Sequence, residues 1–435
     1  MSNKRSKRVH PKWSYSTNIY EVNVRQYTKD GTFNAFAAHL PRLKDMGVQV
    51  LWFMPVQPIS QKGRIGSLGS YYAASDYSTI NPEFGTTEDF KALIDQAHEM
   101  GFKCIMDFVA DHAGNDHPWL LEHPEYFVKG PDNEFIHPHG WSDVCEFNYS
   151  VPEVWKAMTD VLKFWISEYN IDGFRCDMAH LVPLDFWVYA KKKASKLKEG
   201  LFWLAECEEP EYHQVFDATY TWRWMHATEE FYHQKMNLQS LLTVLYKAVT
   251  EFPCDAFRLY FTSNHDENSW NGTEYEKYGD AAKLLAAFSC TWDGIPLIYS
   301  GQELPNEKRL KFFEKDEIDW NGKFELHHFY KTLLTLKSTN KALRAGDPEV
   351  LTQIISHPED HRVFAYLRKY KSSQVLVILN FCDQGLNFQV KNVKGLFRNI
   401  FWNDDIDFEL KGEVWLNPWD FLVFERIPML SEKGT

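Results

Sequence analysis

Apolar runs alternate with amphipathic segments along the first three quarters of the chain. Val48–Val56 is almost continuously apolar, a pattern typical of a parallel strand that is buried on both faces. From Phe33 to Met46, apolar residues recur every three or four positions, which predicts a helix with one buried face. The same criteria predict eight strands, at residues 19–27, 48–56, 102–112, 171–179, 201–207, 215–222, 257–266 and 295–303.

Helical segments separate most of these strands, and this alternation favours a parallel sheet with helical cover. The helix after the second strand has an N-cap candidate, Thr86 or Thr87, and ends at Gly101. A last helix is expected near His327–Lys337. Eight strand–helix units predict an α/β fold, a (β/α)8 TIM barrel, over residues 18–346.

Three segments do not follow this alternation. Residues 112–150, between the third strand and its helix, are too long for an ordinary loop and predict a small lobe inserted over the barrel mouth. Residues 347–435 contain short alternating strands such as Ser373–Phe381, which predict a C-terminal antiparallel β-sandwich domain. Residues 1–17 are expected to be a flexible lead-in.

Composition narrows the class of protein. The net charge of −13 disfavours a nucleic-acid partner, because phosphates require basic surfaces, and it suits a neutral substrate. Aromatic residues make up 16% of the chain, enough to line clefts with flat faces on which sugar rings stack. The chain has no apolar run that predicts a membrane span or a secretory signal. Seven scattered cysteines without paired spacing predict reduced thiols and a cytoplasmic location.

The predicted fourth strand, within IDGFRCDMAH, ends in charged residues. Arg175 and Asp177 are two positions apart on a strand, so both side chains point to the same face. A guanidinium this close should keep Asp177 ionised where water is scarce, and such a carboxylate can attack a sugar carbon. A structural Arg–Asp pair would show the same local pattern.

Other strand ends add carboxylates to the same mouth of the barrel. Glu206 ends the fifth predicted strand, and His265 and Asp266 end the seventh. Glu206 has no cation nearby in the sequence and follows Trp203, so desolvation should raise its pKa and let it act as acid and then base. Asp266 is placed to offset the positive charge of an oxocarbenium-like transition state. Together these residues predict glycoside hydrolysis by two carboxylates.

These stretches resemble the motifs of glycoside hydrolase family 13, the α-amylase family. DFVADH (107–112) is similar to the third-strand motif of the family, and GFRCDMAH (173–180) to its fourth-strand motif. LAE (204–206) matches the acid/base motif, and SNHD (263–266) matches the Asn-His-Asp motif on the seventh strand. The segment 70–90 resembles the loop after the second strand. The resemblance covers about residues 19–346, and a following β domain is typical of the family.

The resemblance implies a role for each matched residue. Asp177 would be the nucleophile, Glu206 the acid/base and Asp266 the transition-state stabiliser. The remaining matched side chains would contact the sugar or the nucleophile, with one of them, Tyr72, as the stacking platform; this substrate-binding set is Tyr72, His112, Arg175, His265 and His180.

Two positions depart from the family pattern. Asp111 stands where many relatives have an Asn that binds calcium, and Glu146 would be the acidic residue that follows in the lobe. The pair could supply oxygen ligands to a structural calcium or form a charged contact within the lobe. His180 stands where many α-amylases have Lys, at a position that faces the leaving-group sugar. The choice between internal and terminal bonds therefore stays open.

The sequence therefore predicts a retaining hydrolase that cleaves α-1,4-glucosidic bonds in α-glucans and maltooligosaccharides through a covalent glycosyl-enzyme, with no cofactor required for the chemistry. A transglycosidase, an exo-acting α-glucosidase and a maltogenic or cyclomaltodextrin-type hydrolase are alternatives on the same site. A non-catalytic sugar-binding relative is disfavoured because all three carboxylates are present. No N-terminal module that would close the cleft by dimerisation is expected, and the oligomeric state stays open.

Overall fold

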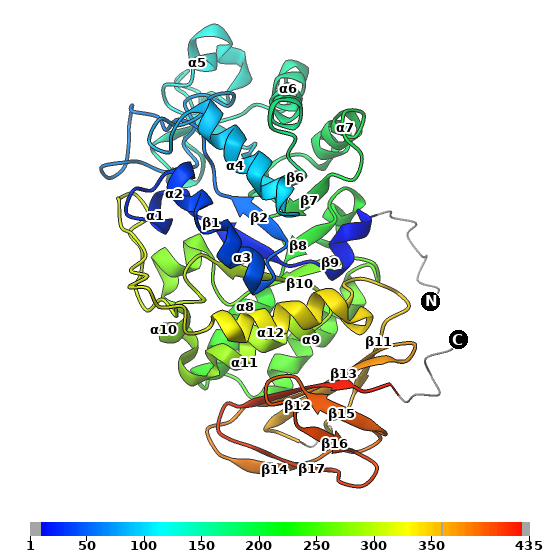
Figure 1. Ribbon diagram of the computed structural model, residues 1–435. Helices are drawn as coiled ribbons and strands as arrows, with labels where there is room; N and C mark the ends of the chain where they lie inside the picture. Colours follow the sequence, from blue (N-terminus) through cyan, green and yellow to red (C-terminus); the bar gives the residue numbers. More distant parts are fainter. Residues whose placement is uncertain (1–9, 358–359, 429–435) are drawn as a thin grey trace.

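A closed barrel of eight parallel strands forms the larger part of the computed structural model, which describes residues 10–357 and 360–428 (Figure 1). Its strands, in their order around the barrel, are β1 (Ile19–Val22), β2 (Val50–Phe53), β3 (Lys103–Val109), β6 (Gly173–Asp177), β7 (Phe202–Ala205), β8 (Ala218–Tyr220), β9 (Phe257–Tyr260) and β10 (Ile295–Tyr299). β10 pairs with β1 and closes the sheet. The predicted TIM barrel is therefore confirmed.

Helices surround the barrel on the outside (Figure 1). They are α1 (Val24–Tyr27), α2 (Phe33–Ala37), α3 (Leu40–Met46), α4 (Thr87–Glu99), α6 (Pro152–Tyr169), α7 (Leu184–Ala194), α8 (Trp222–Tyr232), α9 (Leu238–Glu251), α10 (Glu274–Tyr278), α11 (Ala282–Thr291) and α12 (His327–Thr339). Between β7 and β8 the connection is only a short 3-10 helix, Pro210–Gln214. One of the eight predicted strand–helix units thus lacks an α-helix.

Local chemistry explains several element boundaries. Thr86 caps α4 in a reciprocal capping box with Asp89, as expected from the N-cap candidates. The helix predicted from Phe33 to Met46 divides into α2 and α3, with Pro41 in the first turn of α3, where a missing N–H is tolerated. The first strand ends earlier than predicted, at Val22, because Asn23 caps α1 through its side chain.

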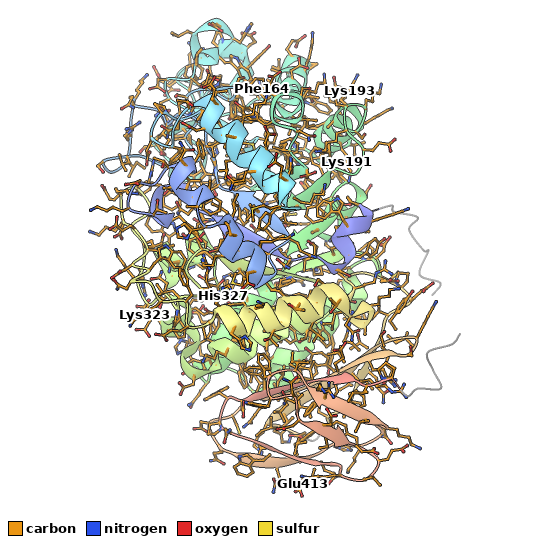
Figure 2. The ribbon with its side chains drawn as sticks, viewed as in Figure 1. Phe164, Lys191, Lys193, Lys323, His327 and Glu413 are labelled. Atoms are coloured by element: carbon orange, nitrogen blue, oxygen red, sulfur yellow. The ribbon has the colours of Figure 1, made fainter. Side chains whose placement is uncertain are left out.

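Side chains fill the barrel and the space between its strands and helices (Figure 2). Inside, buried apolar residues from alternate strand positions pack against one another, including Val50, Ile105, Leu204 and Leu259. A second, larger core joins the outer faces of the strands to the helices. The barrel interior is therefore a packed core, and a ligand would bind at the carboxyl ends of the strands.

The N-terminal segment differs from the expectation of a flexible lead-in over residues 1–17. Residues 1–9 lie outside the described residues, but residues 10–17 pack against the amino ends of the strands. His10 is 2% exposed, its Nδ1 is 2.7 Å from Asp217 Oδ1, and its ring stacks on Phe257. The prediction failed for residues 10–17 because these long-range contacts leave no local signal in the sequence.

The inserted lobe between β3 and α6 contains a small antiparallel pair, β4 (His112–Gly114) and β5 (Val144–Glu146), with α5 (Trp119–Glu122). At the other end of the chain, six strands form an antiparallel sheet in the order β11 (Leu351–Ile354), β12 (Val363–Tyr370), β13 (Ser373–Asn380), β18 (Phe421–Arg426), β15 (Leu396–Asn399) and β16 (Asp405–Asp407). A second sheet, β14 (Leu386–Gln389) with β17 (Glu413–Leu416), shares an apolar core with the first.

The C-terminal strands pack against the barrel through the α11 side. Tyr366 Oη is 2.7 Å from Thr291 Oγ1, and its ring makes an edge contact with Trp292. Among the described helices, none combines the length and apolarity needed to cross a bilayer.

We expect Gly173→Ala to destabilise the barrel, because a Cβ at this position of β6 would lie 2.0 Å from the backbone oxygen of Phe202. The neighbouring strand cannot move without breaking the sheet, so the free energy of unfolding should fall by roughly 1–3 kcal/mol. In the control Gly130→Ala, the nearest atoms belong to the movable side chains of Asp132 and Ile136. Urea unfolding measures both; equal stability of the two variants would contradict the close approach.

Candidate active site

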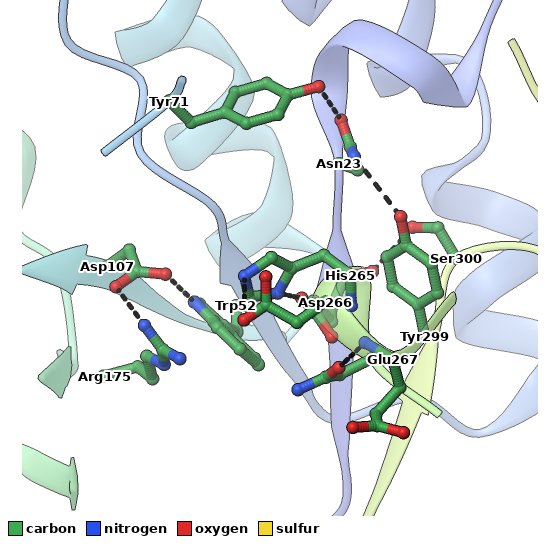
Figure 3. A network of polar contacts seen from close by, with 12 residues as sticks. Asn23, Trp52, Tyr71, Asp107, Arg175, His265, Asp266, Glu267, Tyr299 and Ser300 are labelled. Carbon is green, nitrogen blue, oxygen red and sulfur yellow. Dashed lines mark hydrogen bonds and ion pairs between the residues drawn. The ribbon is translucent and has the colours of Figure 1, made fainter. Parts of the chain in front are cut away.

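The carboxyl ends of the barrel strands bring ionisable side chains to one mouth (Figure 3). β3 supplies Asp107, β6 supplies Arg175 and Asp177, Glu206 follows β7, and Asp266 follows the segment after β9. All but Asp266 are almost fully buried, and the Asp266 side chain is 40% exposed. Residues separated by up to 159 positions in the sequence thus share one site.

Arg175 is the common partner of three carboxylates. Its Nη1 lies 2.6 Å from Asp177 Oδ1 and 3.0 Å from Asp107 Oδ1, and its Nη2 lies 2.7 Å from Glu206 Oε1. The contact with Glu206 is an ion pair whose angle does not make a hydrogen bond, whereas those with the two aspartates are hydrogen bonds. One buried cation therefore fixes the positions of the two acids predicted to do the chemistry.

Glu206 has no cation near it in the sequence, but in the fold it has one, Arg175. Strands β6 and β7 are neighbours, with Arg175 level with Leu204, so the guanidinium reaches the acid that follows β7. Its other oxygen, Oε2, accepts a hydrogen bond of 2.9 Å from the backbone N–H of Met178. Met178 has φ of 40°, a left-handed conformation uncommon for a bulky residue, and it lies directly after Asp177.

Burial raises the pKa of both candidate catalytic acids. The pKa of Asp177 rises to about 6 because desolvation outweighs the opposing effect of Arg175. The pKa of Glu206 rises to about 7, through burial and the negative charges of Asp177 and Asp266, against the effect of Arg175. Both carboxyl groups therefore hold a proton more readily than an exposed carboxyl group does.

Tyr72 and His265 form one wall of the mouth. Their rings stack with centroids 5.4 Å apart, and Tyr72 Oη lies 2.8 Å from His265 Nε2. Tyr72 Oη also donates to Asp107 Oδ2 at 3.1 Å. The phenol is therefore held in place from below while its ring lines the hollow above the acids.

Glu21 is a component of the site that sequence reasoning missed. It lies on β1, is 0% exposed, and its Oε1 is 2.5 Å from His265 Nδ1. Burial alone would lower the pKa of His265, but Asp266 and Glu21 raise it to about 9, so the imidazole is cationic at neutral pH. The available signal was a single acid within the otherwise apolar start of a predicted buried strand, Ile19–Val22.

His112 and Asp111 form a separate pair beside the lobe. His112 Nδ1 is 2.8 Å from Asp111 Oδ2, and its Nε2 is 3.2 Å from the backbone oxygen of Tyr72. Burial would lower the pKa of His112, but the Asp111 carboxylate raises it above its usual value. This geometry brings His112 to the hollow next to the predicted stacking ring.

A calcium ion at Asp111 and Glu146 stays a prediction. One oxygen of Asp111 is paired with His112, and the other is buried without a hydrogen-bond partner, so it is available to a cation. Calcium takes six to eight oxygen ligands, which include backbone carbonyls, and within the described ranges no three acidic, histidine or cysteine side chains gather around such a site. The carboxylate chemistry predicted from the sequence needs no metal.

The hollow above the acids has a volume of about 390 Å³ and is mostly apolar. Four aromatic side chains that the sequence analysis did not select line it: Trp141 from the lobe, Trp270 after Asp266, and Phe312 and Phe313 from the loop after β10. The ring of Phe312 is nearly parallel to that of Tyr72. His180, a predicted substrate contact, is exposed and is not part of the lining.

We expect Glu21→Gln to lower the pKa of His265 by removing the carboxylate that faces its imidazole. In the wild type the folded-state pKa of about 9 lies above the usual value, so the protonated ring stabilises the fold below about pH 6.5, and this contribution is lost as the pH rises toward 9. The variant should show a smaller fall in the free energy of unfolding between pH 7 and 9.

Urea unfolding at both pH values measures the difference. The control is Glu303→Gln, which removes another fully buried carboxylate, paired with Arg42 instead of a histidine. The interpretation is wrong if Glu21→Gln and the wild type lose the same stability over this range.

The sequence and fold of this chain are similar to those of known proteins. The family of α-amylase catalytic domains matches residues 14–141 and 131–324. Among curated proteins, an α-amylase, MalA, from Haloarcula japonica is 28% identical over 398 residues, which cover 85% of this chain and 56% of that protein. Maltosyltransferases and a cyclomaltodextrinase are also among the relatives. The chain spans about half the length of the archaeal relative.

Two crystal structures share the fold over almost the whole chain. An α-amylase from Lactobacillus plantarum has a TM-score of 0.86 and 29% identity, covering 95% of this chain and all of that one. A maltogenic α-amylase from Thermotoga neapolitana has a TM-score of 0.86 and 27% identity, covering 95% and 99%. With the matched catalytic domain extending over most of the barrel, this chain belongs to the α-amylase family, glycoside hydrolase family 13.

Proposed function

We propose that this protein hydrolyses α-1,4-glucosidic bonds in maltooligosaccharides and related α-glucans, with retention of the anomeric configuration. The observation that carries the proposal is the buried guanidinium of Arg175, which contacts both Asp177 and Glu206 at the barrel mouth. Two carboxyl groups with different pKa values beside one hollow are what a glycosidase requires. The names of the relatives supply the class of substrate.

The first step uses the two acids in opposite protonation states. Ionised Asp177 attacks the anomeric carbon of the sugar, while Glu206 gives its proton to the glycosidic oxygen and the leaving sugar departs. This leaves a covalent bond between Asp177 and the glycosyl unit. Met178 N–H and Arg175 both contact Glu206 and hold it in position for proton transfer.

The second step reverses the roles. Glu206, now ionised, removes a proton from water, and the water oxygen attacks the anomeric carbon and releases Asp177. Asp266, with its side chain partly exposed in the hollow, offsets the positive charge that develops on the sugar ring in both steps. Tyr72 offers its ring as the stacking surface, and the cationic His265 holds that ring in place through the Tyr72 hydroxyl.

A sugar hydroxyl can replace water in the second step, and relatives named as maltosyltransferases favour this alternative. The same acids would act, and the occupant of the acceptor side would decide the product. Trp270 and Phe312 give the hollow apolar walls, which would suit a sugar acceptor as well as the leaving group. The product mixture formed from maltotriose separates the two: only transfer gives products longer than the substrate.

We also propose a cytoplasmic location, which the seven unpaired thiols support. The substrate is the only partner that the proposed reaction requires.

Replacing Asp177 by Asn should abolish turnover, because an amide cannot form the glycosyl-enzyme. We expect kcat/KM on maltotetraose to fall at least about 10³-fold. The control is Asp160→Asn, an exposed carboxylate on α6 that pairs with Lys163. Proton NMR of the first wild-type product should show the α anomer; retained turnover in Asp177→Asn, or a β product, would contradict the proposal.

The pH dependence should follow the same two acids. With a pKa of about 6 for Asp177 and about 7 for Glu206, kcat/KM should peak between these values, falling at lower pH as Asp177 is protonated and at higher pH as Glu206 loses its proton. In Glu206→Gln, residual activity on an aryl maltoside, which has a good leaving group, should keep the acidic limb and lose the alkaline limb. An unchanged alkaline limb would assign it to another group.

A further inference from the structure

A second aromatic hollow lies between the barrel and the C-terminal sheets, away from the catalytic mouth. It is bounded by the end of α8 and the following loop, by the turn after β13, and by the turn before β18. Its volume is about 450 Å³, similar to that of the catalytic hollow. Such a concave site with aromatic walls is of the size that binds small ligands.

Trp419 forms one wall of this hollow and is held in an unusual conformation. Its φ of 52° is left-handed, which is rare for a bulky residue and costs on the order of 1 kcal/mol or more. A hydrogen bond of 2.9 Å from its backbone N–H to the Cys382 oxygen fixes the turn. The indole contacts the ring of Tyr232 on the barrel, with centroids 5.3 Å apart, and stays partly exposed. The indole therefore packs against the rings of Phe231 and Tyr232 and also lines the hollow.

The wall next to Trp419 is also held by close contacts. Tyr232 lies against Gly279, where a Cβ would meet its hydroxyl oxygen at 2.0 Å, and Phe231 beside it contacts Phe381 from the C-terminal domain. Both rings are partly exposed. The hollow thus presents rigid aromatic faces from both domains, and little ordering would be needed when a ligand binds.

Polar groups at the rim match a neutral, hydroxyl-rich ligand. Gln234, which also has a left-handed φ of 59°, Lys235 and Asp383 line the hollow and are exposed. Within the described part of the chain none of these three side chains has a hydrogen-bond or ion-pair partner. The ammonium and the carboxylate carry opposite charges, so the rim favours neither an anion nor a cation. Aromatic faces can stack on sugar rings, and side chains at the rim without protein partners can form hydrogen bonds with sugar hydroxyls, so the hollow suits a sugar chain.

We propose that this hollow is a second binding site for α-glucan chains, with Trp419 and Tyr232 as stacking surfaces and Gln234 and Asp383 as hydroxyl partners. The choice of ligand rests on the proposed function, which supplies α-glucan as the substrate of the same molecule. A polymer that is held at this site raises the effective concentration of its other segments at the catalytic mouth. The benefit applies to long chains and not to short oligosaccharides.

The test separates binding at the hollow from catalysis. All proteins carry Asp177→Asn so that starch is not consumed, and adsorption to starch granules is measured for the parent, Trp419→Ala and Gln234→Ala/Asp383→Ala. We expect the apparent affinity for granules to fall about tenfold for Trp419→Ala and to fall for the double variant. The matched control is Trp402→Ala, which removes an indole that is 60% exposed on the same domain and does not line the hollow.

Each outcome has a defined meaning. The double variant alters only exposed side chains, so it decides the matter if Trp419→Ala fails to fold. Unchanged adsorption of the double variant and of folded Trp419→Ala, or an equal loss in Trp402→Ala, would overturn the proposal. If the parent protein is a dimer, Trp419→Ala is a monomer and adsorption to granules is unchanged, the hollow binds a second copy of the chain instead of a glucan. In the active protein, Trp419→Ala should leave kcat/KM on maltotriose within about twofold; lack of maltotriose hydrolysis by the wild type would overturn the proposed function alone.

Discussion

The site depends on one buried guanidinium. Arg175 is 0% exposed and contacts Asp107, Asp177 and Glu206, and the aromatic rings of Trp52 and Tyr220 cover it. A buried charge without partners is costly, and removing one member of such a group leaves the others uncompensated. The arginine and the acids therefore require one another, and the barrel is the scaffold that brings them together from three strands.

The charge balance around this cation explains how the acids hold protons. Five carboxylates, Glu21, Asp107, Asp177, Glu206 and Asp266, surround the mouth, while Arg175 and His265 are the cations within the same network. Burial raises the pKa of Asp107, Asp177 and Glu206, and neighbouring carboxylates raise it further against the opposing effect of Arg175. In the proposed mechanism, this excess of acids keeps a proton available for transfer near neutral pH.

Segments outside the barrel shape what reaches this chemistry. The lobe between β3 and α6 contributes Trp141 and the Asp111–His112 pair, and the loops after β9 and β10 contribute Trp270 and Phe312. These segments come from different parts of the sequence, but all of them add aromatic or polar side chains to the rim of the catalytic hollow. The C-terminal sheets supply Trp419 and Phe381 to a second aromatic surface. In the proposed function, the edges of the molecule bind sugar and the strand ends cleave the bond.

Much of this could be predicted from the sequence, because the determining signals are local. The apolar period of each strand and helix, the spacing of Arg175 and Asp177, and acids such as Glu206 at strand ends predicted the barrel and its mouth. Position along a strand sets which end and which face a side chain occupies.

Only the tertiary structure decided which distant segments of the chain contact each other. The approach of Arg175 to Glu206 follows from the pairing of β6 with β7, and the contact of Glu21 with His265 joins the first strand to the segment after β9. The packing of His10 under the barrel and the pairing of Asp111 with His112 are of the same kind. Such contacts depend on which strands become neighbours when the sheet closes and on how burial shifts the pKa of charged groups. The residues next to a position in the sequence determine neither.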